Sequence, residues 1–123
     1  MKLEARTYAD IAVIAVAGRL DHDNCEHFRA GIKPYLDQGG SGQRIVLDLA
    51  GLDYVSSAGL RCFMLAAKQV RGQGGKIVLA ALRPVVAEIF QISRFDMVFE
   101  LHPSVGAALA ALSPQAAAAF ERG

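Results

Sequence analysis

The sequence predicts an α/β fold, with a mixed and mostly parallel sheet of about five strands and about four helices. The first observation is the continuous apolar run Ile45–Leu47, which is typical of a central strand covered on both faces. The second is the order of strand, helix and strand that ends in this run, because such a unit places its two strands in parallel. The third is the alternation of apolar and charged residues over residues 1–8, which indicates an edge strand with one solvated face.

Length and composition indicate one domain. A chain of 123 residues, of which 53% are hydrophobic and 20% charged, is large enough for a single core and too apolar to stay disordered. The net charge of +1 gives no electrostatic attraction to nucleic acid or to anionic lipid. The longest apolar run, Ile11–Ala17, is far shorter than the roughly 20 residues of a membrane-spanning helix, and no basic and apolar leader precedes it. We therefore expect a cytoplasmic protein without nucleic-acid or membrane partners.

The first part of the chain is expected to form two strands and a helix. After a polar break at residues 9–10, the run Ile11–Ala17 is expected to return antiparallel to residues 1–8 and to lie deeper in the sheet. Helical periodicity begins at Asp21, with Asp21 or Asp23 as the capping residue or first-turn acid. The apolar stripe of this helix comprises Cys25, Phe28, Ile32 and Leu36.

Two residues weaken the end of this helix. Gly31 lowers its stability, and Pro34 has no backbone N–H to donate, so we expect a kink or an early stop near Lys33. The glycine-rich residues 38–42 then separate the helix from the central strand.

The central strand is expected to lead through a loop, residues 50–55, into a second helix. Within the strand, Asp48 is expected to hydrogen-bond the local backbone. The apolar stripe of the helix recurs with helical spacing at Leu60, Phe63, Met64, Ala67 and Val70.

The C-terminal half begins with a glycine-rich segment, residues 71–76. It lacks the spacing of a phosphate-binding loop and follows a helix rather than a strand, so we interpret it as a helix end and a turn. The elements expected after it are a strand at 77–82, a helix from Pro84, a short strand at 95–101 and a helix from Pro103. The domain is expected to span residues 1–112, followed by a C-terminal tail, residues 113–123, that is either helical or disordered.

Two adjacent serines, Ser56 and Ser57, stand at the start of the second helix, and three uses of this position compete. A serine oxygen is among the best acceptors for the free N–H groups of a first helical turn. A phosphate on a serine there would lie against the positive end of the helix dipole, so the fold would tolerate it. A nucleophilic serine would require a sharp G-x-S-x-G turn, and the first glycine of that pattern is absent, which disfavours catalysis.

The expected topology places a second loop beside these serines. If the strands that contain Ile11 and Ile45 run parallel, the loops that follow them open at the same edge of the sheet, where α/β proteins usually place their sites. Asp21 and Ser57 would then share one surface. Asp21 has helix capping and partner contact as compatible roles.

The second helix carries more apolar surface than one sheet face requires. Beside its stripe, a neighbouring arc comprises Ala58, Cys62, Leu65 and Ala66. This arc is either a docking surface for another protein or a surface that a neighbouring helix of the same chain covers.

Nothing in the sequence indicates metal or cofactor chemistry. The three histidines, His22, His27 and His102, lack the spacing of metal ligands. The two cysteines, Cys25 and Cys62, form no C-x-x-C pair, so we expect separate, half-buried thiols rather than a disulfide framework or a zinc site. We predict no catalytic residue, no cofactor and no metal.

The segment LDLAGLDYVSSAGLRCF, residues 47–63, resembles the signature of the STAS domain, and in particular of the bacterial anti-sigma factor antagonists. Gly18–Asp21, Gly74–Ala80 and Ile92–Asp96 match further features of the family in the same order, so the resemblance covers residues 1–112. It implies the STAS fold and a partner switch. In this switch, the unphosphorylated protein binds an anti-sigma factor that is also a serine kinase and thereby frees the sigma factor.

By its place in the motif, Ser57 corresponds to the serine that the kinase phosphorylates, and a phosphatase would reverse the step. The chain departs from the family at Ser56, where Asp is frequent, and at Ala58, where a second hydroxyl is frequent. The predicted partner-binding residues, besides Ser57, are Asp21, Ser56, Ala58, Gly59, Arg61, Cys62 and Leu65. The protein is expected to be a monomer or weak dimer without enzymatic activity. The alternatives are a STAS module of another complex, such as a transporter, a phospholipid-trafficking complex or a stressosome-like scaffold, and a small serine hydrolase.

Overall fold

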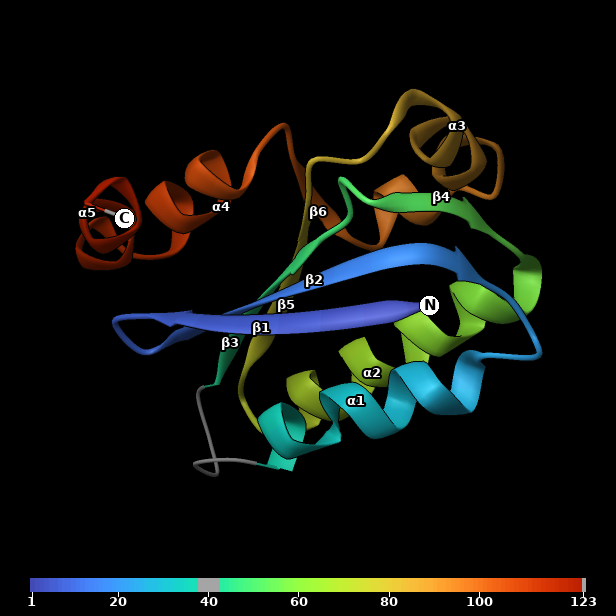
Figure 1. Ribbon diagram of the computed structural model, residues 1–123, viewed down its shortest axis with the longest axis horizontal. Helices are drawn as coiled ribbons and strands as arrows, with labels where there is room; N and C mark the ends of the chain where they lie inside the picture. Colours follow the sequence, from blue (N-terminus) through green and yellow to red (C-terminus); the bar gives the residue numbers. More distant parts are fainter. Residues whose placement is uncertain (38–42, 123) are drawn as a thin grey trace.

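The computed structural model describes residues 1–37 and 43–122, and Figure 1 shows their arrangement. The elements in chain order are β1 (Lys2–Tyr8), β2 (Ile11–Leu20), α1 (Cys25–Asp37), β3 (Arg44–Asp48), β4 (Leu52–Val55), α2 (Ser57–Gly72), β5 (Lys76–Ala80), α3 (Pro84–Ile92), the 3-10 helix η1 (Phe95–Met97), β6 (Glu100–His102), α4 (Val105–Leu112) and α5 (Pro114–Glu121). Within these ranges, no helix combines the length and the apolar character that crossing a bilayer requires.

The sheet confirms the predicted α/β class. Its strand order is β1-β2-β3-β5-β6, with β1 antiparallel to β2 and the other pairs parallel. The expected edge strand is β1. The expected parallel pairing of the Ile11 and Ile45 strands is also confirmed, because Ala12 pairs with Ile45 in the register of β2 and β3.

Helices cover both faces of the sheet (Figure 1). Side chains from alternate positions of β3 explain this: Ile45 and Leu47 join the core beneath α1, α2 and α3, whereas Val46 joins a second core beneath α4 and α5. All three side chains are at most 1% exposed. The run is apolar at every position because each face of the strand packs against its own set of helices.

Three local predictions need correction. Residues 50–55, expected as a loop, contain the short strand β4, which pairs with the end of β2. Residues 95–101, expected as a strand, begin as η1 and become extended only in β6. Of the kink or early stop expected near Lys33, the early stop is wrong, because helix α1 continues through Pro34 to Asp37. The break expected at residues 38–42 lies outside the described residues.

The predicted local role of Asp48 is confirmed. At the end of β3, its Oδ1 accepts a hydrogen bond from the Ala50 N–H at 3.1 Å. This contact turns the chain out of the central strand and toward β4.

The tail forms helix α5, which packs on the domain. The Tyr8 and Phe120 rings meet edge to face with centroids 5.3 Å apart, and Ala116 is fully buried. Ser113 begins the helix by accepting a hydrogen bond from the Ala116 N–H. Apolar side chains that follow the Ser113-Pro114 break thus anchor α5 beside β1. The domain boundary at Leu112 stays a prediction.

Glu100 links the edge strand β6 to β5. Its carboxylate lies 2.6 Å from Lys76 Nζ and 2.6 Å from His102 Nε2. The hydrogen bond from Lys76, and then that from His102, hold the pKa of Glu100 below its ordinary value of 4.5. A carboxyl whose pKa is lower in the folded than in the unfolded state stabilises the fold above the unfolded-state pKa, and this contribution disappears as the pH falls through the folded-state pKa.

Glu100→Gln is therefore expected to lower the free energy of unfolding by about 0.5 kcal/mol at pH 7, a small value because the carboxylate is partly in water. The difference from the unmodified protein should shrink as the pH falls below 4.5. Urea denaturation at neutral and acidic pH measures both quantities. Glu88→Gln is the matched control, since Glu88 is exposed and makes no ion pair within the described ranges. If the difference in the free energy of unfolding stayed constant with pH, it would contradict a stabilising role of the ionised Glu100.

Candidate functional site

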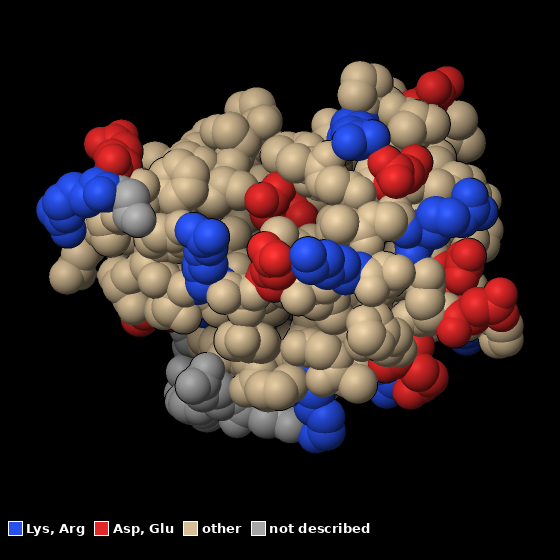
Figure 2. Space-filling model, in the orientation of Figure 1, with Lys and Arg blue, Asp and Glu red and all other residues tan. Residues whose placement is uncertain are grey.

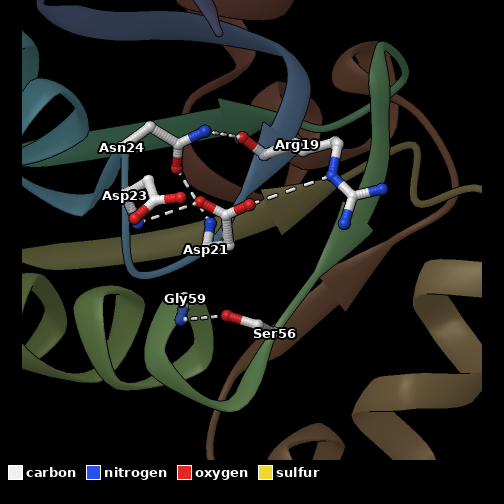
Figure 3. A network of polar contacts seen from close by, with 6 residues as sticks. All are labelled: Arg19, Asp21, Asp23, Asn24, Ser56 and Gly59. Carbon is white, nitrogen blue, oxygen red and sulfur yellow. Dashed lines mark hydrogen bonds and ion pairs between the residues drawn. The ribbon is translucent and has the colours of Figure 1, made fainter.

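The site begins at the turn from β4 into α2, where the two serines have different roles. Ser56 is the N-cap: its backbone is extended, with φ −87° and ψ 174°, and its Oγ accepts a hydrogen bond from the Gly59 N–H at 3.1 Å (Figure 3). The Ser56 N–H donates to the Leu20 carbonyl oxygen at 2.9 Å, which ties the turn to the end of β2. Helix capping thus accounts for Ser56.

Ser57 is the first residue of α2, and its side chain is exposed. Its hydroxyl has no hydrogen-bond partner in the part of the chain that the structure describes. It borders a hollow of about 430 Å³ between α1 and α2. The hydroxyl is therefore accessible to an enzyme from outside.

These two assignments predict opposite effects on stability. Ser56→Ala removes the cap acceptor and is expected to lower the free energy of unfolding by about 1 kcal/mol. Ser57→Ala removes an exposed hydroxyl that bonds to none of the described residues, and it is expected to change the free energy of unfolding by less than about 0.5 kcal/mol. Chemical denaturation of the two variants side by side measures the difference. Equal losses, or a larger loss for Ser57→Ala, would contradict the division of roles.

The loop after β2 lies beside this turn, as expected from the parallel topology. Leu20 and Val55 are register partners in the β2–β4 pair, so the residues that follow them, Asp21 and Ser56, leave the sheet at the same edge. Figure 3 shows the two loops side by side. Asp21 and Ser57 therefore belong to one end of the molecule.

Asp21 organises its own loop instead of capping α1. Its N–H donates to Asn24 Oδ1 at 2.8 Å, its Oδ1 accepts from the Asp23 N–H at 3.1 Å, and its Oδ2 lies 3.8 Å from Arg19 Nε (Figure 3). The expectation that Asp21 or Asp23 begins the helix is wrong. The first helical hydrogen bond is accepted by the Asn24 carbonyl oxygen, from the Phe28 N–H, because residues 21–24 form a turn with these side-chain contacts.

Gly59 lies beneath the serine turn and is buried. A Cβ atom at this position would lie 2.5 Å from the Leu20 carbonyl oxygen and 2.8 Å from Val55 Cγ2. The absence of a side chain at Gly59 thus allows α2 to start directly against the end of β2.

The apolar arc of α2 is divided between the core and the surface. Cys62 and Ala66 are buried between α1 and α2, whereas Leu65 is 47% exposed and Ala58 is half-buried. Neighbouring helix α1 covers one half of the arc and leaves the other half open. Among the predicted partner-binding residues, Gly59 and Cys62 therefore lie below the surface, and Ser57, Ala58, Arg61 and Leu65 lie on it.

The hollow beside Ser57 has an apolar floor and a rim of polar and charged side chains. Cys25, Ala58, Cys62 and Leu65 contribute to it, together with the rim residues His22, Glu26, Arg29 and Arg61. Arg29 Nη1 and Glu26 Oε1 form an ion pair at 3.1 Å, and Arg61 is exposed one helical turn after Ser57. On the face shown in Figure 2, Lys and Arg are interspersed with Asp and Glu, so no single-sign field covers it.

The structure corrects the expectation for the two cysteines. It joins Cys25 and Cys62 in a disulfide, with the Cα atoms 6.3 Å apart. Each cysteine occupies an apolar position of its helix, and this position is the only feature of the sequence that bears on the disulfide. The way α1 crosses α2 decides that the two positions meet, and residue spacing does not encode that crossing.

The described part of the site holds neither a serine–histidine pair nor a metal cluster. No histidine hydrogen-bonds Ser57 within the described ranges, although a nucleophilic serine requires a base in that position. The same ranges contain no group of three His, Cys, Asp or Glu side chains that would hold a metal ion. What the site does offer is an exposed hydroxyl at a helix start, next to an apolar hollow.

Comparison with known proteins identifies the family. The family model of the STAS domain matches residues 2–108. A Bordetella bronchiseptica protein named as an anti-sigma factor antagonist, BtrV, is 40% identical over 111 residues, which cover 90% of this chain and 94% of that protein.

Solved structures show the same fold. The anti-sigma factor antagonist SpoIIAA in its unphosphorylated form matches with a TM-score of 0.74 and 21% identity, over 90% of this chain and 96% of that one. SpoIIAA of Bacillus in its phosphorylated form matches with a TM-score of 0.69 and 20% identity, over 91% of this chain and 100% of that one. The murine anion transporter Slc26a9 matches with a TM-score of 0.75 and 18% identity, over 85% of this chain but 18% of the transporter. The family model and the identity with BtrV show that the chain belongs to the STAS domain family and, within it, to the anti-sigma factor antagonists.

Proposed function

We propose that the protein binds an anti-sigma factor with serine kinase activity, and that phosphorylation of Ser57 by this kinase ends the binding. The observation that carries the proposal is the exposed hydroxyl of Ser57 at the start of α2, which makes no hydrogen bond to the described residues. The names of BtrV and SpoIIAA, and the two phosphorylation forms of SpoIIAA, support the assignment of a partner and of a modification. A phosphatase would restore the binding form.

The fold tolerates a phosphate on Ser57. The first turn of α2 presents free N–H groups and the positive end of the helix dipole, both of which stabilise an anion. Arg61, exposed one turn along the same helix, adds a cation on the same side. The modification therefore leaves the domain folded, and its effect falls on the partner.

The contact surface comprises Ser57, Ala58, Arg61, Leu65 and Asp21, with Ser56, Gly59 and Cys62 supporting it from below. Leu65 and Ala58 supply apolar contact area, and Arg61 and Asp21 supply charges at its edge. Burying a dianion in the middle of such a surface costs several kcal/mol unless the partner supplies matching cations. We therefore expect phosphorylation to lower the affinity for the partner by orders of magnitude.

Incubation of the protein with candidate anti-sigma kinases and ATP, followed by intact-mass analysis, tests the proposal. One phosphate is expected on the unmodified protein and on Ser56→Ala, and none on Ser57→Ala. Peptide mapping locates the phosphate. An unmodified protein with every kinase tested, or a phosphate that persists in Ser57→Ala, would refute the proposed site.

The likeness to Slc26a9 favours one competing function, that of an interaction module in a larger assembly. A module of this kind would bind its partner without any change at Ser57. Binding to a purified anti-sigma factor, measured before and after treatment with the kinase, separates the two functions. The switch requires that the treated protein loses its affinity.

A further inference from the structure

Cys25 and Cys62 form a disulfide at the hollow beside Ser57. Cys25 is the first residue of α1, and Cys62 lies in the second turn of α2. Their Cα atoms are 6.3 Å apart, inside the range of about 4.4–6.8 Å that a disulfide bridges without moving the backbone. We propose that this pair is a reversible redox-modification site, which a peroxide closes to the disulfide and a dithiol reductant reopens.

The surroundings of the pair suit this chemistry. The hollow of about 430 Å³ reaches both cysteines, of which Cys25 is half-buried and Cys62 is 4% exposed. Arg61 and the ion pair of Arg29 with Glu26 border the same hollow, and oxidation of a thiol follows its exposure to the oxidant. Cys25 is therefore the residue that meets the oxidant, and Cys62 is the residue that resolves the product.

The two steps balance as follows. The Cys25 thiolate attacks one oxygen of hydrogen peroxide, so that an S–O bond forms, the O–O bond breaks and hydroxide leaves, which gives a sulfenic acid. The Cys62 thiol then attacks the Cys25 sulfur, so that the S–S bond forms, the S–O bond breaks and water leaves. In total, two thiols and one peroxide give one disulfide and two waters. Exchange with a dithiol returns both thiols and leaves the dithiol oxidised.

The redox state also alters a contact next to Ser57. The Cys25 Sγ lies 3.5 Å from the Ala58 carbonyl oxygen. A thiol has a proton to donate to this oxygen, whereas a disulfide sulfur has none, so the contact is a hydrogen bond only in the reduced protein. Oxidation replaces that hydrogen bond with the covalent Cys25–Cys62 bond, which joins the start of α1 to α2. An effect on partner binding rests on the proposed function, but the formation of the disulfide does not.

The test uses the full chain and no partner, so its outcome is independent of the proposed function. The protein is reduced, freed of reductant, treated with hydrogen peroxide and then alkylated under denaturing conditions. Intact mass is expected to show the loss of two hydrogen atoms and no alkyl group, and a dithiol should restore two alkylatable thiols. Oxidation should also raise Tm by roughly 10 °C, since the link closes a long segment of chain.

Two variants serve as controls, Cys25→Ser and Cys62→Ala. Each retains one thiol and cannot form the intramolecular disulfide, so peroxide is expected to leave Tm without a rise; oxygen is expected to add to Cys25 in Cys62→Ala but not to the buried Cys62 in Cys25→Ser. Amide hydrogen exchange in residues 25–29 and 57–62 is expected to be slower in the oxidised unmodified protein than in the reduced protein. Three results would overturn the proposal: two alkylated thiols after peroxide treatment, a disulfide that joins two chains, or a disulfide that resists the dithiol. Identical exchange in both states would overturn the link to the Ser57 surface.

Discussion

Ser57→Glu is expected to weaken binding to the anti-sigma factor by about 100-fold or more, which corresponds to roughly 2.7 kcal/mol. The carboxylate places a fixed negative charge at the exposed start of α2, beside the apolar surface of Ala58 and Leu65. Desolvating this charge in the complex is costly, whereas in the free protein it faces water and the favourable helix terminus. Titration calorimetry with the purified anti-sigma factor measures the loss.

Ser57→Gln is the matched control for this substitution. Glutamine has nearly the size and shape of glutamate but no charge, so it reports the steric part of the effect alone. We expect Ser57→Gln to bind far more tightly than Ser57→Glu, and both variants to unfold within about 0.5 kcal/mol of the unmodified protein. Equal losses of affinity would show that the size of the side chain, not its charge, controls the interface. Unchanged affinity in both variants would show that Ser57 does not lie in the interface.

Gly59→Ala is expected to lower the free energy of unfolding by about 2–3 kcal/mol. The new methyl group would meet the Leu20 carbonyl oxygen at 2.5 Å and Val55 Cγ2 at 2.8 Å. Both are parts of the sheet edge, so the start of α2 has to move away from it. The hydrogen bond between the Gly59 N–H and Ser56 Oγ depends on the same turn and is expected to weaken with it.

Gly72→Ala, at the other end of the same helix, is the control for this variant. A Cβ atom at Gly72 meets nothing within 4 Å. Alanine there should leave the free energy of unfolding unchanged or raise it by up to about 1 kcal/mol, because alanine favours helix more than glycine does. Chemical denaturation of both variants measures the contrast. A similar effect at the two glycines would mean that helix propensity, not the close approach to β2, governs Gly59.

Local patterns in the sequence were sufficient for much of the fold. The apolar run at Ile45–Leu47 and the alternation over residues 1–8 correctly predicted the central strand and the edge strand. The order of strand, helix and strand correctly predicted a parallel pair, and through it the meeting of the Asp21 loop with the serine turn. These predictions succeed because burial periodicity and the handedness of the connection depend on residues close together in the chain.

Short elements were harder to predict. β4 and η1 are too short for periodicity to reveal them, and β4 exists because the end of β2 offers it a hydrogen-bonding edge. Helix α1 continues past Pro34, although the local signal favoured a kink or an early stop there. Its apolar stripe, which includes Ile32 and Leu36, packs in the core on both sides of the proline, and this packing outweighs the missing hydrogen bond.

The sequence by itself determined the fold class, the position of a hydroxyl pair at a helix start and the resemblance to the STAS domain. Only the tertiary structure decided that Ser56 is the cap while the Ser57 hydroxyl has no partner within residues 1–37 and 43–122, that α1 covers Cys62 and leaves Leu65 exposed, and that Cys25 reaches Cys62. The physical reason is the same in each case. A pattern along the chain specifies which side chains share a face, whereas the contact between two faces depends on how separate elements approach each other in space.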